Sequence, residues 1–199
     1  MQTEADVLAL LATNLIFSVK IAPLVVVVAT IVRSALLLTG NRRALVSWTR
    51  NTVLSIATFV FLPGMLINTA VRYGVCSLLG IDLEGIGGGS TYAELNLFLK
   101  VDRPPKVAVL VTALYVSTVA SLYIGFTLLF LPVVLLLRAP VILLCWYLAL
   151  CVLFNSSLRG GDFHLLGAAL QKHPGRGVAE LFLALAVLIV FYAYVGVGI

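Results

Sequence analysis

Apolar residues fill this chain in runs that are longer than a buried helix of a soluble protein needs. The first run is Val7–Leu38, interrupted by Lys20 and Pro23, and the second is Thr52–Gly80. A membrane-spanning helix needs about 20 predominantly apolar residues, so both runs are long enough to span. The first run predicts either one long, tilted or kinked helix, or an interfacial helix followed by a span that begins at Ile21.

Three further apolar runs follow in the second half of the chain. They are Val107–Leu131, Val141–Leu153 and Val178–Ile199. The pattern therefore predicts five membrane spans, or six if the first run divides. Proline should interrupt this pattern at Pro63, which should bend or break the second run, and at Pro132, which should help to bound a short link between the third and fourth spans.

The segment between the second and third spans has a different periodicity. From Tyr92 to Val101 polar and apolar residues alternate, which is typical of a strand with one buried face. A lone strand is not stable, so we expect it to pair with Ile81–Glu84 or Ile86. The sequence therefore predicts a small β element inside an otherwise helical protein.

Composition agrees with a membrane protein. The 199 residues are 62% hydrophobic and only 11% charged, and the mean hydropathy is +1.15. Soluble domains are typically about 45–50% apolar and about 25% charged. The expected fold class is an all-α polytopic membrane protein with a small β element. We expect one integral membrane domain over 1–199, with an N-terminal helical segment at 1–50, a core at 52–170 and a C-terminal transmembrane helix at 178–199.

The formal charge of +5 does not indicate a nucleic-acid partner, because the basic residues sit in short loops between apolar runs. In that position they set topology or contact lipid headgroups. Loops 81–106 and 159–176 together carry six Lys or Arg residues, against four in the opposite connections. This bias predicts that both loops are cytoplasmic, and we expect an integral protein of the plasma membrane of a prokaryotic-type cell.

Polar groups form a stripe inside the second apolar run. Asn68, Arg72 and Cys76 are spaced i, i+4, i+8 and therefore share a helix face, with Thr69 beside them. Polar side chains within a membrane helix are costly unless other groups bond to them. The sequence therefore predicts that Asn68, Thr69 and Arg72, called the polar stripe below, face partners inside the protein.

The order of these features resembles the site-2 protease family of intramembrane zinc metalloproteases. The resembling residues are Phe61–Arg72, Cys76 and Gly80, then the strand before Val101, then Asn155–Asp162. In that family a zinc helix with His-Glu-x-x-His is followed by a β element, a span, and a turn with a metal-binding Asp. The resemblance covers roughly 52–170 and implies a similar fold.

The residues that carry the family's reaction are replaced here. At the His-Glu-x-x-His positions stand Asn68, Thr69 and Arg72, and of the metal set only Asp162 carries over. Asn is a poor zinc ligand, Thr cannot act as a carboxylate base, and Arg is always protonated. The resemblance implies a fold whose metal motif is lost, so no catalytic residue and no cofactor are expected. We predict that Arg72 and Asp162 form an ion pair where the metal would bind.

The sequence therefore favours a non-catalytic scaffold or accessory subunit, a pseudoprotease that contacts membrane lipids and other membrane protein chains. An alternative is an active metallohydrolase with a divergent zinc site drawn from Asp162, His164, His173 and Cys76. Another alternative is a small transporter component. Zinc bound to the purified protein would favour the enzyme.

Overall fold

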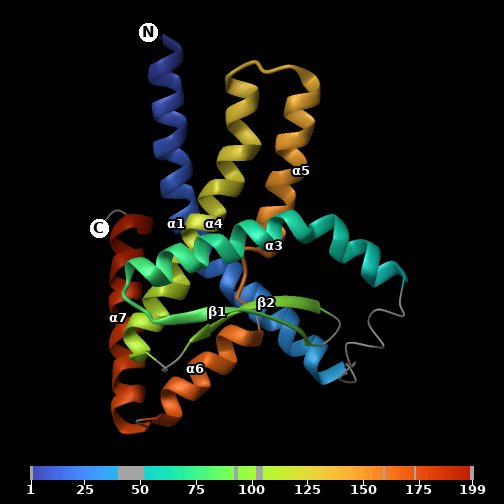
Figure 1. Ribbon diagram of the computed structural model, residues 1–199. Coiled ribbons are helices and arrows are strands. Elements are labelled where there is room, and N and C mark those ends of the chain that lie inside the picture. Colours follow the sequence, from blue (N-terminus) through green and yellow to red (C-terminus); the bar gives the residue numbers. More distant parts are fainter. Residues whose placement is uncertain are drawn as a thin grey trace.

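The computed structural model describes residues 2–39, 52–91, 94–101, 105–158, 160–172 and 174–197 (Figure 1). Some predictions fall outside these ranges. They concern the basic residues of the connections, the start of the predicted strand and one candidate metal ligand: Arg42, Arg43, Arg50, Arg103, Arg159, Tyr92, Ala93 and His173.

The described chain is mainly helical, as the apolar runs predicted. The helices are α1 (Gln2–Thr39), α3 (Thr52–Leu78), α4 (Val107–Val134), α5 (Ala139–Asn155), α6 (Gly160–Lys172) and α7 (Pro174–Val197). Within the described residues, four stretches are long and apolar enough to cross a membrane, in α1, α3, α4 and α7. The predicted fourth span, α5, is a shorter apolar helix of 17 residues. The fold is that of an all-α polytopic membrane protein.

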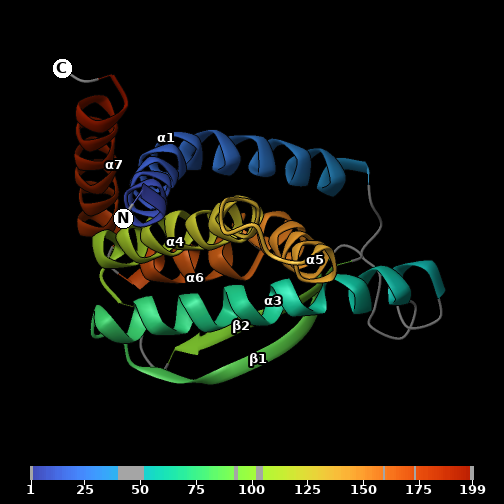
Figure 2. The same cartoon turned by 90° about the horizontal axis from the view of Figure 1, so that it is seen from above.

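Internal prolines are accommodated within helices, and one of them overturns a predicted helix boundary. Pro23, Pro63 and Pro132 all lie inside helices. The first apolar run is thus one continuous helix, which Figures 1 and 2 show to be bent, and α4 continues past the residue that was expected to end it. An internal proline removes one backbone hydrogen bond, but in apolar surroundings the remaining groups gain most by staying helical.

The segment that follows Asn155 also differs from the prediction, because residues 160–172 form α6 rather than a polar connection. Its apolar positions explain the helix. Leu165, Leu166, Ala169 and Leu170 pack around Val107 and Leu110 at the start of α4. The helical spacing of these residues gives α6 one buried face, and the helix brings Asp162 into its first turn.

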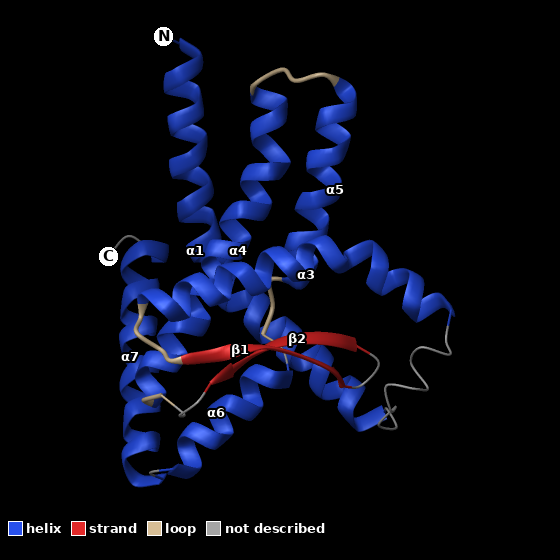
Figure 3. Cartoon of the chain, in the orientation of Figure 1, coloured by secondary structure: helices blue, strands red, loops and turns tan. Residues whose placement is uncertain are grey.

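The predicted β element is present as a hairpin. Strand β1 (Leu83–Thr91) pairs antiparallel with β2 (Glu94–Val101), so that Leu83 lies opposite Val101. β1 is longer than the predicted partner strand, because it continues through the glycines at 85 and 87–89. Figure 3 shows the hairpin, in red, beneath α3.

Helix α3 lies at the centre of this arrangement. It contacts α4, α5 and both strands, and in the view of Figure 2 it runs between the hairpin and the pair of α4 and α6. In Figure 1 the link between α4 and α5 is at the top, whereas the hairpin, the end of α6 and the start of α7 are in the lower half. The polar stripe on α3 is therefore enclosed by other elements.

Glycine allows α5 to pack very closely on its neighbours. A Cβ atom at Gly64 of α3 would overlap the Cys151 carbonyl of α5 and would lie 2.8 Å from the Val152 nitrogen. A Cβ at Gly125 of α4 would lie 2.6 Å from a terminal carbon of Leu153. Small residues at such contacts let helix backbones approach, which is how helices associate in membranes.

Candidate functional site

The polar stripe is buried, and α3 positions it against α4 and the α5–α6 link. Asn68, Thr69 and Arg72 are 1%, 4% and 7% exposed. Asn68 and Arg72 are one helical turn apart, so both side chains leave α3 on the same side. The structure thus encloses three polar side chains that the sequence placed within a membrane helix.

Arg72 and Asp162 are brought together, as the sequence predicted. The Nη1 atom of Arg72 lies 2.7 Å and 2.6 Å from the two carboxylate oxygens of Asp162. The side chains are 9% and 14% exposed. Asp162 is in the first turn of α6, where the free backbone N–H groups and the helix dipole also favour a negative charge.

The guanidinium group of Arg72 also binds backbone. Its Nη2 atom donates to the Ser157 carbonyl at 2.9 Å, within the link between α5 and α6. One side chain of α3 therefore holds both the link and the first turn of α6. Planar guanidinium groups with several donors suit this kind of double contact better than lysine does.

Asn68 makes the equivalent contact one turn earlier. Its amide nitrogen donates to the carbonyl of Asn155, the last residue of α5. Helix ends leave carbonyls without an intrahelical donor, and Asn68 supplies a donor to one of them. On its other side, the Ser121 hydroxyl of α4 donates to the Asn68 side-chain oxygen at 3.3 Å. Thr69 donates within α3, to the Met65 carbonyl at 2.8 Å.

A second row of donors, which the sequence interpretation missed, lies on α5. Tyr147 donates to the Val60 carbonyl at 2.6 Å, Cys151 donates to the same carbonyl at 3.4 Å, and Asn155 donates to the Phe61 carbonyl at 3.4 Å. These carbonyls precede Pro63, which disturbs the helical bonding of that turn. The spacing of 147, 151 and 155, combined with a proline in another span, is the signal that could have identified them.

A small cavity adjoins the ion pair. Its volume is about 30 Å³, and Thr69, Arg72, Cys76, Ser117 and Asp162 are among the residues that line it. Organic ligands occupy pockets of about 300–1,000 Å³, so this cavity suits at most a water molecule or two. Within the described residues, the Nε atom of Arg72 is buried and has no hydrogen-bond partner. The site is therefore a set of closely packed polar contacts rather than a substrate pocket.

Of the four candidate zinc ligands, Asp162 and Cys76 line the same small cavity, and the structure brings no described histidine to them. Asp162 binds Arg72 through both oxygens, His164 is exposed on α6, Cys76 is half-buried beside the cavity, and His173 lies outside the described residues. Among the residues that the structure describes, no group of three or more His, Cys, Asp or Glu side chains is placed to hold a metal. Arg72 also puts a permanent positive charge against Asp162, so the residues that are present do not fit a zinc ion.

Comparison of the chain with protein-family models, with curated proteins and with solved structures gave no match. The resemblance to site-2 proteases rests on the order of features in the sequence, and the function has to be argued from the geometry above.

Proposed function

We propose that this protein is a non-catalytic integral membrane scaffold or accessory subunit with a site-2 protease-like fold, and that it binds transmembrane helices of partner chains. The ion pair of Arg72 with Asp162 carries the proposal. In the family that the sequence resembles, the residues at the positions of Arg72 and Asp162 hold zinc, and the glutamate at the position of Thr69 activates water. Here the same two segments are joined by a salt bridge, which connects α3 to α6 without offering an open coordination position.

The partner surface in this proposal is the outward face of α7. Only 6% of the residues in the most apolar window of α7 are buried within the chain, compared with 44% for α4. The exposed positions include Phe182, Val187, Val190 and Tyr194. A helix that contacts its own chain along one side is free to contact another chain along the other, through close packing of side chains.

We propose further that loops 81–106 and 159–176 face the cytoplasm of a prokaryotic-type cell. Lys100, Lys106, Lys172 and Arg176 are all exposed, and the hairpin, the end of α6 and the start of α7 lie in the same half of Figure 1. An excess of basic residues on one side favours the cytoplasmic side.

Metal analysis separates the scaffold from the divergent hydrolase. We expect the purified chain to contain far less than one zinc ion per molecule after dialysis against micromolar zinc, because Arg72 already neutralises Asp162. His164→Ala, a change at an exposed position, should leave this result unchanged. Stoichiometric zinc that is lost in His164→Ala would contradict the proposal and favour the enzyme.

Photo-crosslinking in native membranes tests the partner surface. With a photoreactive amino acid at Val187 or Val190 of α7, we expect a discrete adduct with another protein. The matched control is Leu143 of α5, which is 63% exposed, compared with 59% and 69% for the two α7 positions. If positions 187 and 190 gave only the lipid adducts expected at position 143, α7 would not be a partner surface.

A further inference from the structure

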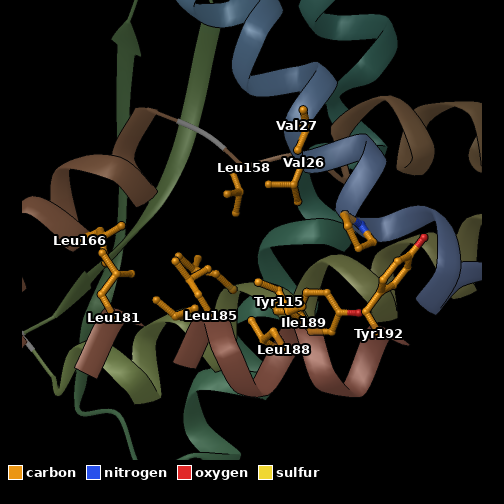
Figure 4. Close-up of a pocket in the computed structure, with 13 residues that line it drawn as sticks. Val26, Val27, Tyr115, Leu158, Leu166, Leu181, Leu185, Leu188, Ile189 and Tyr192 are labelled. Carbon is orange, nitrogen blue, oxygen red and sulfur yellow. The ribbon is translucent and has the colours of Figure 1, made fainter. Parts of the chain in front are cut away.

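An apolar groove of about 420 Å³ opens between α1, α4, α6 and α7 (Figure 4). Pro23 of α1, Leu114 of α4 and Leu166 of α6 contribute to its wall. From α7 it is lined by Leu181, Leu185, Leu188 and Tyr192, whose spacing of three and four residues places them on one helix face. Figure 4 shows these side chains gathered around one space.

The size of the groove indicates what it holds. A helix of about 10 Å diameter and about 5.4 Å pitch occupies roughly 420 Å³ per turn, so the space would take about one turn of a transmembrane helix. A hydrocarbon chain is thin and unbranched and needs no polar partner. The groove therefore suits a lipid acyl chain better than a protein helix.

Basic side chains stand beyond one end of this groove. A Cβ at Gly177 would lie 3.3 Å from the Cα of Leu170 and 3.4 Å from a methyl carbon of Val107, so the start of α7, the end of α6 and the start of α4 meet there. Lys106, Lys172 and Arg176 lie within two residues of this meeting point, and all three are exposed. We call these three residues the basic junction. Glu180 lies one turn along α7 and is half-buried. Its single negative charge does not balance the three positive charges, so the junction keeps an excess of positive charge.

The groove and the basic junction are continuous. Val111, Leu166 and Leu181 line the groove, and the same residues pack on Val107, Leu110 and Ala169 just inside the junction. Val111 is one helical turn from Val107, and Leu181 is one turn from Gly177, which places Val107 and Gly177, the chain neighbours of Lys106 and Arg176, about 5.4 Å or slightly more beyond the apolar wall. An anionic headgroup and an acyl chain of one molecule are joined over a similar distance.

We propose that this groove and the basic junction form a binding site for one anionic phospholipid. The acyl chain occupies the groove, and Lys106, Lys172 and Arg176 bind the phosphate-bearing headgroup. Basic groups between membrane helices bind anionic headgroups in this way, and anionic lipids are enriched in the cytoplasmic leaflet. The proposal does not rest on the scaffold function or on the α7 partner surface.

Native mass spectrometry of the full chain in detergent tests the site, with dioleoyl phosphatidylglycerol and dioleoyl phosphatidylcholine as competing probes. We expect wild-type protein to retain phosphatidylglycerol preferentially. Each basic residue near an anionic headgroup raises the affinity about fivefold. In the triple variant Lys106→Gln, Lys172→Gln, Arg176→Gln, the preference for phosphatidylglycerol over phosphatidylcholine should therefore fall at least about tenfold. The control Arg138→Gln removes an exposed charge beyond the other end of α4 and should keep the preference.

A separate variant tests the part of the proposed site that binds the acyl chain. Leu185→Trp fills the groove and should reduce retention of both lipids, whereas Leu183→Trp, at a position 64% exposed on another face of α7, should not. Equal retention of the two lipids by the wild-type protein would overturn the proposal, and so would equal losses in Leu185→Trp and Leu183→Trp. A photoreactive group at position 185 that captured a protein instead of lipid would also overturn it.

Discussion

Replacing Arg72 with methionine is expected to lower the free energy of unfolding by about 3–5 kcal/mol, because it removes the guanidinium group that binds both oxygens of the largely buried Asp162 carboxylate. The Asp162 side chain is 14% exposed, and both of its oxygens accept from Arg72. The Ser157 carbonyl would lose its donor as well. Unfolding in mixed micelles, followed by circular dichroism, gives the measurement.

Two companion variants identify the cause of this effect. Arg138→Met removes an arginine from an exposed position and should change stability by no more than about 0.5 kcal/mol. Arg72→Met combined with Asp162→Leu should recover most of the loss, because a buried ion pair that is replaced as a whole by apolar residues is often close to neutral. If Arg72→Met were as stable as Arg138→Met, the ion pair would contribute nothing to the fold.

Replacing Gly64 with alanine is the second change for which we expect a large loss of stability, about 3 kcal/mol. The added methyl group would meet backbone atoms, the carbonyl of Cys151 and the nitrogen of Val152, and these cannot rotate away as a side chain can. Helix α5 would have to move from α3, which would also stretch the bonds from Tyr147 and Cys151 to the Val60 carbonyl.

The same helix provides a matched control. At Gly74 of α3 a Cβ atom would meet nothing within 4 Å. Gly74→Ala should therefore be neutral or stabilising by up to about 1 kcal/mol, since alanine favours the helix more than glycine does. Thermal unfolding of the two variants in the same detergent compares them directly. Equal stability of both would show that α3 and α5 are less closely packed at Gly64 than the structure indicates.

Much of the fold could be predicted because its elements are local patterns. The long apolar runs indicate membrane helices, since a span of about 20 apolar residues is set by the thickness of the bilayer. The alternation that ends at Val101 indicates a strand, and the hairpin with β1 follows from the need of a strand for a partner. The patterns failed at Pro132, where α4 continues to Val134, and at α6, because contacts with other helices decide whether an interrupted or polar segment is helical.

The candidate site was predictable only in part. Asn68 and Arg72 stand out because polar groups within an apolar helix require partners, and the order of segments suggested Asp162 as one of them. That Asn68 binds the end of α5 and that Arg72 also holds the Ser157 carbonyl could not be predicted. Backbone carbonyls are present at every residue, so only the path of the chain decides which of them comes within reach.

The sequence by itself determined the class of the protein, an all-helical membrane protein with one hairpin, and it located the charged residues that have to be buried. Those properties depend on residue type and on spacing along one segment. Tertiary structure alone decided the close packing of α5 at Gly64, the groove between α1, α4, α6 and α7, and the contact of the start of α7 with the end of α6 and the start of α4. These features join segments that are far apart in the chain, and helix packing, which is non-local, brings them together.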